Sequence, residues 1–188
     1  MSDENNPLHE SGMGEKLYFA YSDNINFNQM LFCCPTAQVV GPAVLEDYEL
    51  LFRSSKGRNG LATIAPHKGG KVNGLLWKIS PKDEKSLDID RTHRNLYEKD
   101  EVTVWDRNGR EFTAIVYEMV TLWKEPAVPS SNYYNLILEG YQQYGLPVGA
   151  LKRAWEHSIE EVHGMKVRIN DPSRQRSKPK KRRKGHER

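Results

Sequence analysis

The stretch LYFAYSDN at residues 17–24 decides the fold that this sequence predicts. Its first five residues are apolar or aromatic, which predicts a buried or half-buried strand. The polar residues 22–24 then favour a turn, because their side chains bond to nearby backbone groups. A helical run follows at residues 26–33, with Asn24 or Asn26 as its cap. A strand, a tight loop and a helix start place backbone N–H groups where they can bind an anion.

Away from this stretch, strands dominate the first two thirds of the chain and helices close it. Two strand segments joined by a bend are expected at residues 37–52, and shorter strands at 61–65 and 71–79, separated by a turn at 66–70. A hairpin turn at residues 107–110 joins strands at 96–105 and 112–122. Helices are expected after Ser80, at 130–144 and from there to about Ser158. This order indicates an α+β domain.

The charge of the chain is divided between an acidic body and a basic C-terminal arm. Residues 166–188 contain 11 Lys and Arg against two acidic residues, a net charge of +9, whereas the 188-residue chain carries +3. Residues 1–165 therefore carry −6. This division argues against nucleic-acid binding by the folded part and permits it for the arm.

Composition also predicts the limits of the domain. Residues 1–14 contain almost no large apolar side chain, so we expect a disordered N-terminal tail, then one domain at 15–164 and a basic, disordered tail at 165–188. The N-terminal stretch lacks the features of a signal peptide, and no apolar run reaches the roughly 18 residues of a membrane span. We expect a soluble protein without membrane contact, cytoplasmic or, in a eukaryotic cell, nuclear.

Cys33 and Cys34 are the two cysteines of the chain, and they are adjacent. A disulfide framework needs separated pairs, so we expect reduced thiols. A redox or metal site is the alternative, but the sequence supplies no further metal ligands beside them. We therefore expect small packing residues at a helix end, and no metal.

Several short stretches occur in an order that resembles the γ-glutamylcyclotransferase family. The first is YFAYSDN at residues 18–24, where the family usually has YFAYGSN. The resemblance spans roughly residues 16–158 and implies a small mixed β-barrel flanked by helices. Further matching stretches are VGPA at 40–43, GLATI at 60–64, VNGLLW at 72–77 and GLP at 145–147.

The reaction that the resemblance implies is intramolecular and uses no cofactor. The α-amine of a γ-glutamyl substrate attacks the substrate's own side-chain carbonyl, an amine or amino acid leaves, and 5-oxoproline forms. The loop after the first strand holds the γ-glutamyl group, and a Glu in an LDxxEG motif takes the proton from the ammonium as general base.

This sequence departs from the family at the general base. Residues 87–92 read LDIDRT, which puts Arg91 where Glu belongs. An Arg cannot act as a base, because its pKa exceeds about 12. A gap of one residue would align Asp90 instead, but its side chain is one methylene shorter, and catalysis is sensitive to about 1 Å.

The binding loop departs as well, because Ser22 replaces Gly and Asp23 replaces Ser. The Ser closes a backbone angle that Gly leaves open, and the carboxylate of Asp23 would repel a substrate carboxylate. Tyr21 and Asn24 remain as in the family. Tyr97 and Tyr117 match pocket tyrosines of the family by resemblance, and aromatic packing in a strand is the alternative for both.

Two hypotheses follow. We favour a catalytically silent or altered protein of this fold, a pseudoenzyme that binds a small γ-glutamyl-like molecule or a protein partner. The alternative is an active γ-glutamylcyclotransferase with a rearranged site that uses Asp90 or Asp23. The basic arm has the density of a nuclear localisation signal and would also make a weak contact with nucleic acid. Its cluster consists of Lys178, Lys180, Lys181, Arg182, Arg183 and Lys184.

Overall fold

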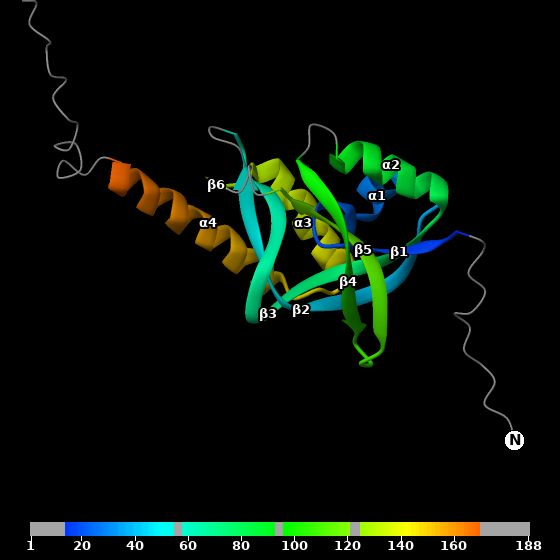
Figure 1. Cartoon of the computed structure of the whole chain (residues 1–188). Helices are drawn as coiled ribbons and strands as arrows, with labels where there is room; N and C mark the ends of the chain where they lie inside the picture. Colours follow the sequence, from blue (N-terminus) through cyan, green and yellow to red (C-terminus); the bar gives the residue numbers. More distant parts are fainter. Residues whose placement is uncertain (1–13, 55–57, 93–95, 121–124, 170–188) are drawn as a thin grey trace, which may run out of the picture.

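A computed structural model describes residues 14–54, 58–92, 96–120 and 125–169 (Figure 1). The strands are β1 (Lys16–Ala20), β2 (Gln38–Ser54), β3 (Leu61–Ile79), β4 (Tyr97–Asp106), β5 (Glu111–Met119) and β6 (Glu125–Pro126). The helices are α1 (Phe27–Cys33), α2 (Pro81–Thr92), α3 (Ser131–Gln143) and α4 (Val148–Ile169), and a 3₁₀ turn covers Asp23–Ile25. None of the helices described is both long and apolar enough to cross a membrane.

The strands close into a small mixed barrel. The order β3–β1–β5–β4–β2 returns to β3 through a β2–β3 pairing, and the short β6 adds to the edge of β2. β1 and β5 run parallel, whereas the other neighbours in the ring are antiparallel. The expected α+β fold with a mixed barrel and flanking helices is therefore confirmed.

One long hairpin, β2–β3, replaces the separate segments that the sequence predicts at residues 37–79. The pairing runs from Gln38 with Lys78 to Arg53 with Leu61, but it is interrupted between the pair of Glu46 with Lys71 and the pair of Tyr48 with Pro66, so residues 67–70 leave the ladder where a turn was expected at 66–70. At this interruption, residues 67–70 of β3 face the single residue Asp47 of β2, which has a φ of 59°, and Gly69 has a φ of 78°. Bulges kink a strand without ending its pairing, and this interruption allows a single hairpin to curve around the barrel.

Helices α1, α2 and α3 begin directly after residues whose side chains cap them. Asn26, rather than Asn24, caps α1, because its side chain accepts hydrogen bonds from the backbone of residues 28 and 29. Ser80 Oγ accepts from Asp83 N at 3.2 Å, and Ser130 caps α3 in the same way. The last helix differs from the prediction: α4 continues past Ser158 and past the expected domain limit at 164 to Ile169.

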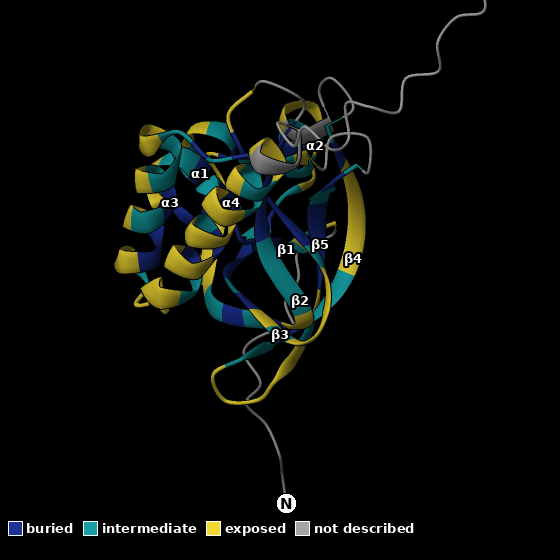
Figure 2. Cartoon of the chain, turned by 90° about the vertical axis from the view of Figure 1, so that its left-hand side faces the viewer, coloured by how far each residue is buried: buried dark blue, intermediate teal, exposed yellow. Residues whose placement is uncertain are grey.

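Two glycines let backbones approach closely around the loop that follows β1. A Cβ on Gly74 would lie 2.5 Å from Ala20 O, so β3 passes directly beside the end of β1. A Cβ on Gly140 would lie 2.7 Å from Asn26 N, so α3 packs against the 3₁₀ turn. Figure 2 shows the buried residues gathered in the barrel and on the inner faces of the helices. The loop is thus fixed between a strand and a helix.

Candidate functional site

The loop after β1 is a tight, mostly buried turn. Ser22 and Asn24 are buried and Asp23 is half-buried. Ser22 O accepts from Ile25 N at 3.1 Å, and Ser22 Oγ donates to Asp23 Oδ1 at 2.9 Å. The φ of Ser22 is −116°, which any residue adopts, so the loop holds this conformation without a glycine at position 22.

Two of the expected site tyrosines meet. The buried Tyr21 donates its hydroxyl to the backbone oxygen of Tyr117 at 2.5 Å. The ring of Tyr18 stands edge-on to the ring of Tyr117, with 5.9 Å between the centroids. The parallel pairing of β1 with β5 brings these residues together. Tyr117 therefore lies beside the loop, as the resemblance implies.

Asn24 is the loop residue with an unsatisfied polar atom. Its side chain is buried, and its Nδ2 donates a long hydrogen bond of 3.4 Å to Tyr18 Oη. Among the residues that the structure describes, its Oδ1 has no hydrogen-bond partner. A buried acceptor without a partner costs about 1–3 kcal/mol, so this oxygen is suited to a donor supplied by a ligand.

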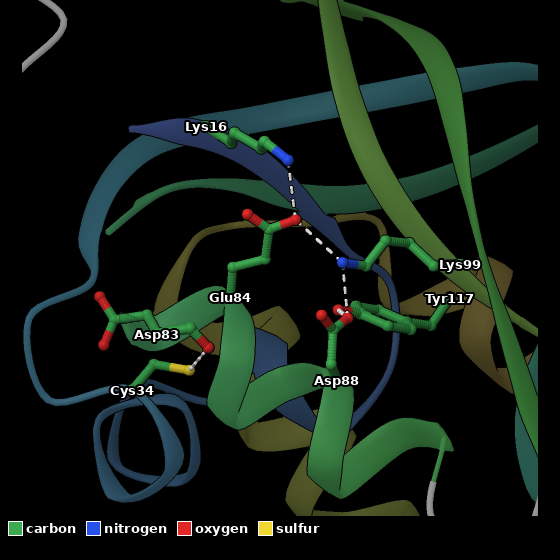
Figure 3. A network of polar contacts seen from close by, with 7 residues as sticks. All are labelled: Lys16, Cys34, Asp83, Glu84, Asp88, Lys99 and Tyr117. Carbon is green, nitrogen blue, oxygen red and sulfur yellow. Dashed lines mark hydrogen bonds and ion pairs between the residues drawn. The ribbon is translucent and has the colours of Figure 1, made fainter. Parts of the chain in front are cut away.

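A chain of charges joins α2 to the barrel beside Tyr117 (Figure 3). Lys99 Nζ on β4 lies 2.6 Å from Asp88 Oδ1 and 2.9 Å from Glu84 Oε1. Lys16 Nζ on β1 contacts the same Glu84 oxygen at 2.8 Å. Tyr117 donates its hydroxyl to Asp88 Oδ1 at 2.6 Å.

The chain of charges sets the ionisation of its members. Burial raises the pKa of the Asp88 carboxyl, but hydrogen bonds from Lys99 and Tyr117 outweigh burial and hold this pKa below its usual value. The hydrogen bond from Lys16 lowers the pKa of Glu84. Burial, and then the bond to Asp88, raises the pKa of the Tyr117 hydroxyl. Both carboxyls are therefore ionised and weakly basic at neutral pH.

Sequence reasoning missed Glu84, Lys99 and Lys16. Glu84 and Asp88 are four residues apart on α2, so their shared helix face was a readable signal. The lysines gave no such signal, because Lys16 lies 68 residues from Glu84 in the chain. Only the closed barrel brings β1, β4 and α2 together.

The other expected site residues lie elsewhere. Tyr97 is buried and donates its hydroxyl to Ala62 O at 2.9 Å, a contact that ties β4 to β3. Asp90 is exposed on α2, about 200° around the helix from Asp88. Position 91 shares the face of Leu87 and Asp88, but the Arg91 side chain lies outside the described part of the structure. The arm residues Lys178, Lys180, Lys181, Arg182, Arg183 and Lys184 also lie outside it.

The cysteines have packing contacts. Cys33 and Cys34 are reduced, and the buried Cys34 donates its thiol to the backbone oxygen of Asp83 at 3.5 Å. This contact joins the end of α1 to the start of α2. The described residues contain no cluster of His, Cys, Asp and Glu that could hold a metal ion.

Comparison with known proteins gives the family. The model of the family "Gamma-glutamyl cyclotransferase, AIG2-like" matches residues 18–136. The gamma-glutamylcyclotransferase of Bos taurus is 32% identical over 151 residues, which cover 77% of this chain and 78% of the relative. That of Homo sapiens is 33% identical over 139 residues, 70% of this chain and 73% of the relative.

A solved structure agrees with the sequence comparison. A gamma-glutamyl cyclotransferase superimposes with a TM-score of 0.68 and 31% identity, over 74% of this chain and 86% of that chain. The chain therefore belongs to the gamma-glutamyl cyclotransferase, AIG2-like family.

Proposed function

We propose that this protein is a binding member of the family that no longer forms 5-oxoproline. The observation that carries the proposal is the face of α2 that lies against the barrel. Its carboxylates, Glu84 and Asp88, are both bonded to Lys99. Arg91 stands where the family motif has its general base.

Each carboxylate on α2 has a physical reason to be a poor base. A general base has to accept a proton from the substrate ammonium, and its basicity falls as its pKa falls. The pKa values of Glu84 and Asp88 are lowered, and Asp88 already accepts bonds from Lys99 and Tyr117. Asp90 is turned about 200° away from Asp88, toward solvent.

The loop supports binding but disfavours the family's substrate. The unpartnered Asn24 Oδ1 suits a ligand with an N–H donor, such as an amine or an amide. Asp23 adds a negative charge where the resemblance places the substrate carboxylate. Two such charges about 4 Å apart repel by about 4 kcal/mol at an effective dielectric constant near 20. A donor-bearing ligand with less negative charge fits the loop better than a γ-glutamyl amino acid.

The test is 5-oxoproline release from γ-glutamyl dipeptides, γ-glutamyl-ε-lysine and glutathione, with human gamma-glutamylcyclotransferase assayed in parallel. We expect no release above the uncatalysed background. Turnover that disappears in an Asp90→Asn or Asp23→Asn variant would establish the rearranged enzyme instead. Binding is followed in the same samples through the Asn24 side-chain amide signal in NMR spectra, which a ligand at the loop should shift.

Restoring the family residues gives a sharper test. We expect Arg91→Glu alone to stay inactive, because the loop still carries Asp23. The combination of Arg91→Glu with Ser22→Gly and Asp23→Ser is expected to gain measurable release. Arg91→Gln is the matched control, because it removes the same positive charge without supplying a base. Robust turnover by Arg91→Glu alone would show that the loop does not limit the reaction.

A further inference from the structure

A cavity lies between the β2–β3 hairpin and the last two helices, and its lining includes Glu49 of β2 and Arg153 of α4. It has a volume of about 300 Å³ and is formed by the β2–β3 hairpin together with α3 and α4. Its lining contains no residue of the loop at 21–24 or of α2. It is therefore separate from the candidate site.

Four side chains of basic residues line this cavity: His67 and Lys71 from β3, and Arg153 and His157 from α4. Glu49 is the carboxylate among its lining residues, and it lies 3.8 Å from His67 Nδ1. The body of the protein carries −6, and Lys71 and Arg153 nevertheless bring two positive charges to this one cavity.

These four side chains differ in the contacts that they already make with carboxylates. Lys71 contacts Glu46 at 2.9 Å, in an exposed pair that contributes little. His157 lies 3.9 Å from Glu161. Within the described part of the chain Arg153 has no ion-pair partner, although it lines the cavity. Its guanidinium is the strongest hydrogen-bond donor there that remains available to a ligand.

The remaining lining is apolar or aromatic. Val72 is buried on β3, and Leu50 and Ala154 face the same space from β2 and α4. Tyr48 on β2 is half-buried and lines the same space with an aromatic ring, whereas Tyr141 on α3 is fully buried and donates its hydroxyl to Asn73 O at 3.3 Å. A small organic group can therefore lie against these side chains while an anion faces the cations.

We propose that this cavity binds a small molecule through a phosphate group. A phosphate offers more acceptor oxygens than a carboxylate, which matches the several donors from two elements. The planar fork of Arg153 binds two of these oxygens at once, and Lys71 acts as a point charge. The aromatic and aliphatic wall accommodates the organic part of a phosphate monoester.

The test is an NMR titration of the full chain with inorganic phosphate and with phenyl phosphate, at constant ionic strength near 150 mM. We expect saturable shifts of the backbone amides of Val72, Asn73 and Ala150. Phenyl phosphate should bind at least threefold more tightly than inorganic phosphate, because its ring buries apolar area against the half-buried Tyr48 and Leu50. Equal affinity would overturn the organic part of the proposal and leave a site for the free anion.

Arg153→Gln should weaken phenyl phosphate about tenfold, and Lys152→Gln is its matched control. Lys152 is the neighbouring residue on α4, with an exposed side chain paired to Glu156 at 3.5 Å, and it does not line the cavity. Its loss should change the affinity less than twofold. Equal weakening by both variants would assign the binding to general charge, the basic arm included, and overturn the proposal. The absence of saturable shifts up to 20 mM ligand would overturn it too.

Discussion

Helices α2 and α4 both contact the barrel through charged side chains, and they differ in how completely those charges are matched. On α2, Glu84 and Asp88 share Lys99, and Glu84 also binds Lys16. On α4, Glu161 forms a bidentate ion pair with Arg53, with N–O distances of 2.6 and 3.0 Å.

The two helices differ in whether a charged side chain remains available to bind a ligand. At α2 the carboxylates and lysines neutralise one another, so a charged substrate meets groups that are already bonded. At α4, Arg153 remains without an ion-pair partner among the described residues, beside a cavity. Whether a charged side chain on a helix can bind a ligand thus depends on its ion pairs with other elements. The number of charged residues on the helix does not reveal this.

The largest effect on stability is expected at the ion pair between Glu161 on α4 and Arg53 on β2. Glu161→Ala leaves the buried Arg53 without its carboxylate, and breaking such a pair costs about 3 kcal/mol of unfolding free energy. Chemical denaturation of the variant measures this loss. Glu156→Ala on the same helix is the control, because its pair with Lys152 is exposed and should cost less than about 0.5 kcal/mol. Equal losses for both would mean that Arg53 does not anchor α4.

Lys99→Met tests the ion pairs that join α2 to the barrel, and it should have a smaller effect on stability. The substitution keeps most of the aliphatic stem but leaves Asp88 and Glu84 without their shared cation, so we expect a loss of about 1–2 kcal/mol at pH 7. Lys71→Met is the control, since it removes an exposed pair with Glu46 on β2. A loss no greater than that of the control would show that α2 is held by its apolar contacts alone.

The pH dependence of stability should reveal the same network. The pKa values of Glu84 and Asp88 are lowered in the folded protein, so their contribution is present above their unfolded values, near 4.3 and 3.9. It is lost as the pH falls through the folded values. The cost of Lys99→Met should therefore shrink between pH 5 and pH 3. A cost that stays constant over this range would contradict the assignment.

The smallest effect is expected at the ends of the chain. Deletion of residues 1–13 and 170–188 should shift the melting temperature by less than about 2 °C, because neither segment has the apolar pattern of a packed element. Differential scanning calorimetry of the shortened and full chains gives the comparison. A clearly lower melting temperature would mean that α4 depends on contacts beyond Ile169.

Some of the fold and of the site could be predicted from the sequence. The turn at 22–24 and the cap at Asn26 follow from local side chains, whereas the contact of Tyr21 with Tyr117 was not predicted. The single β2–β3 hairpin could not be predicted, because Pro66 and Gly69 indicate a turn that would separate two strands. The chain does leave the ladder at residues 67–70, but pairing with β2 resumes on both sides, at Pro66 and Lys71, and this joins the two segments into β3.

By itself, the sequence determined the features whose partners lie within a few residues. Asn26 and Ser80 start their helices because each side chain bonds to backbone N–H groups two or three positions on. Gly109 occupies the hairpin turn after β4 because its φ of 76° strains any residue with a Cβ.

Only the tertiary structure decided which charges are matched. Arg53 and Glu161 are 108 residues apart, and Asp88 meets Tyr117 across 29 residues. Closure of the barrel and the docking of α2 and α4 set these distances. Because salt screens exposed charges beyond about 8–10 Å, these side chains interact strongly only where the fold brings them close together.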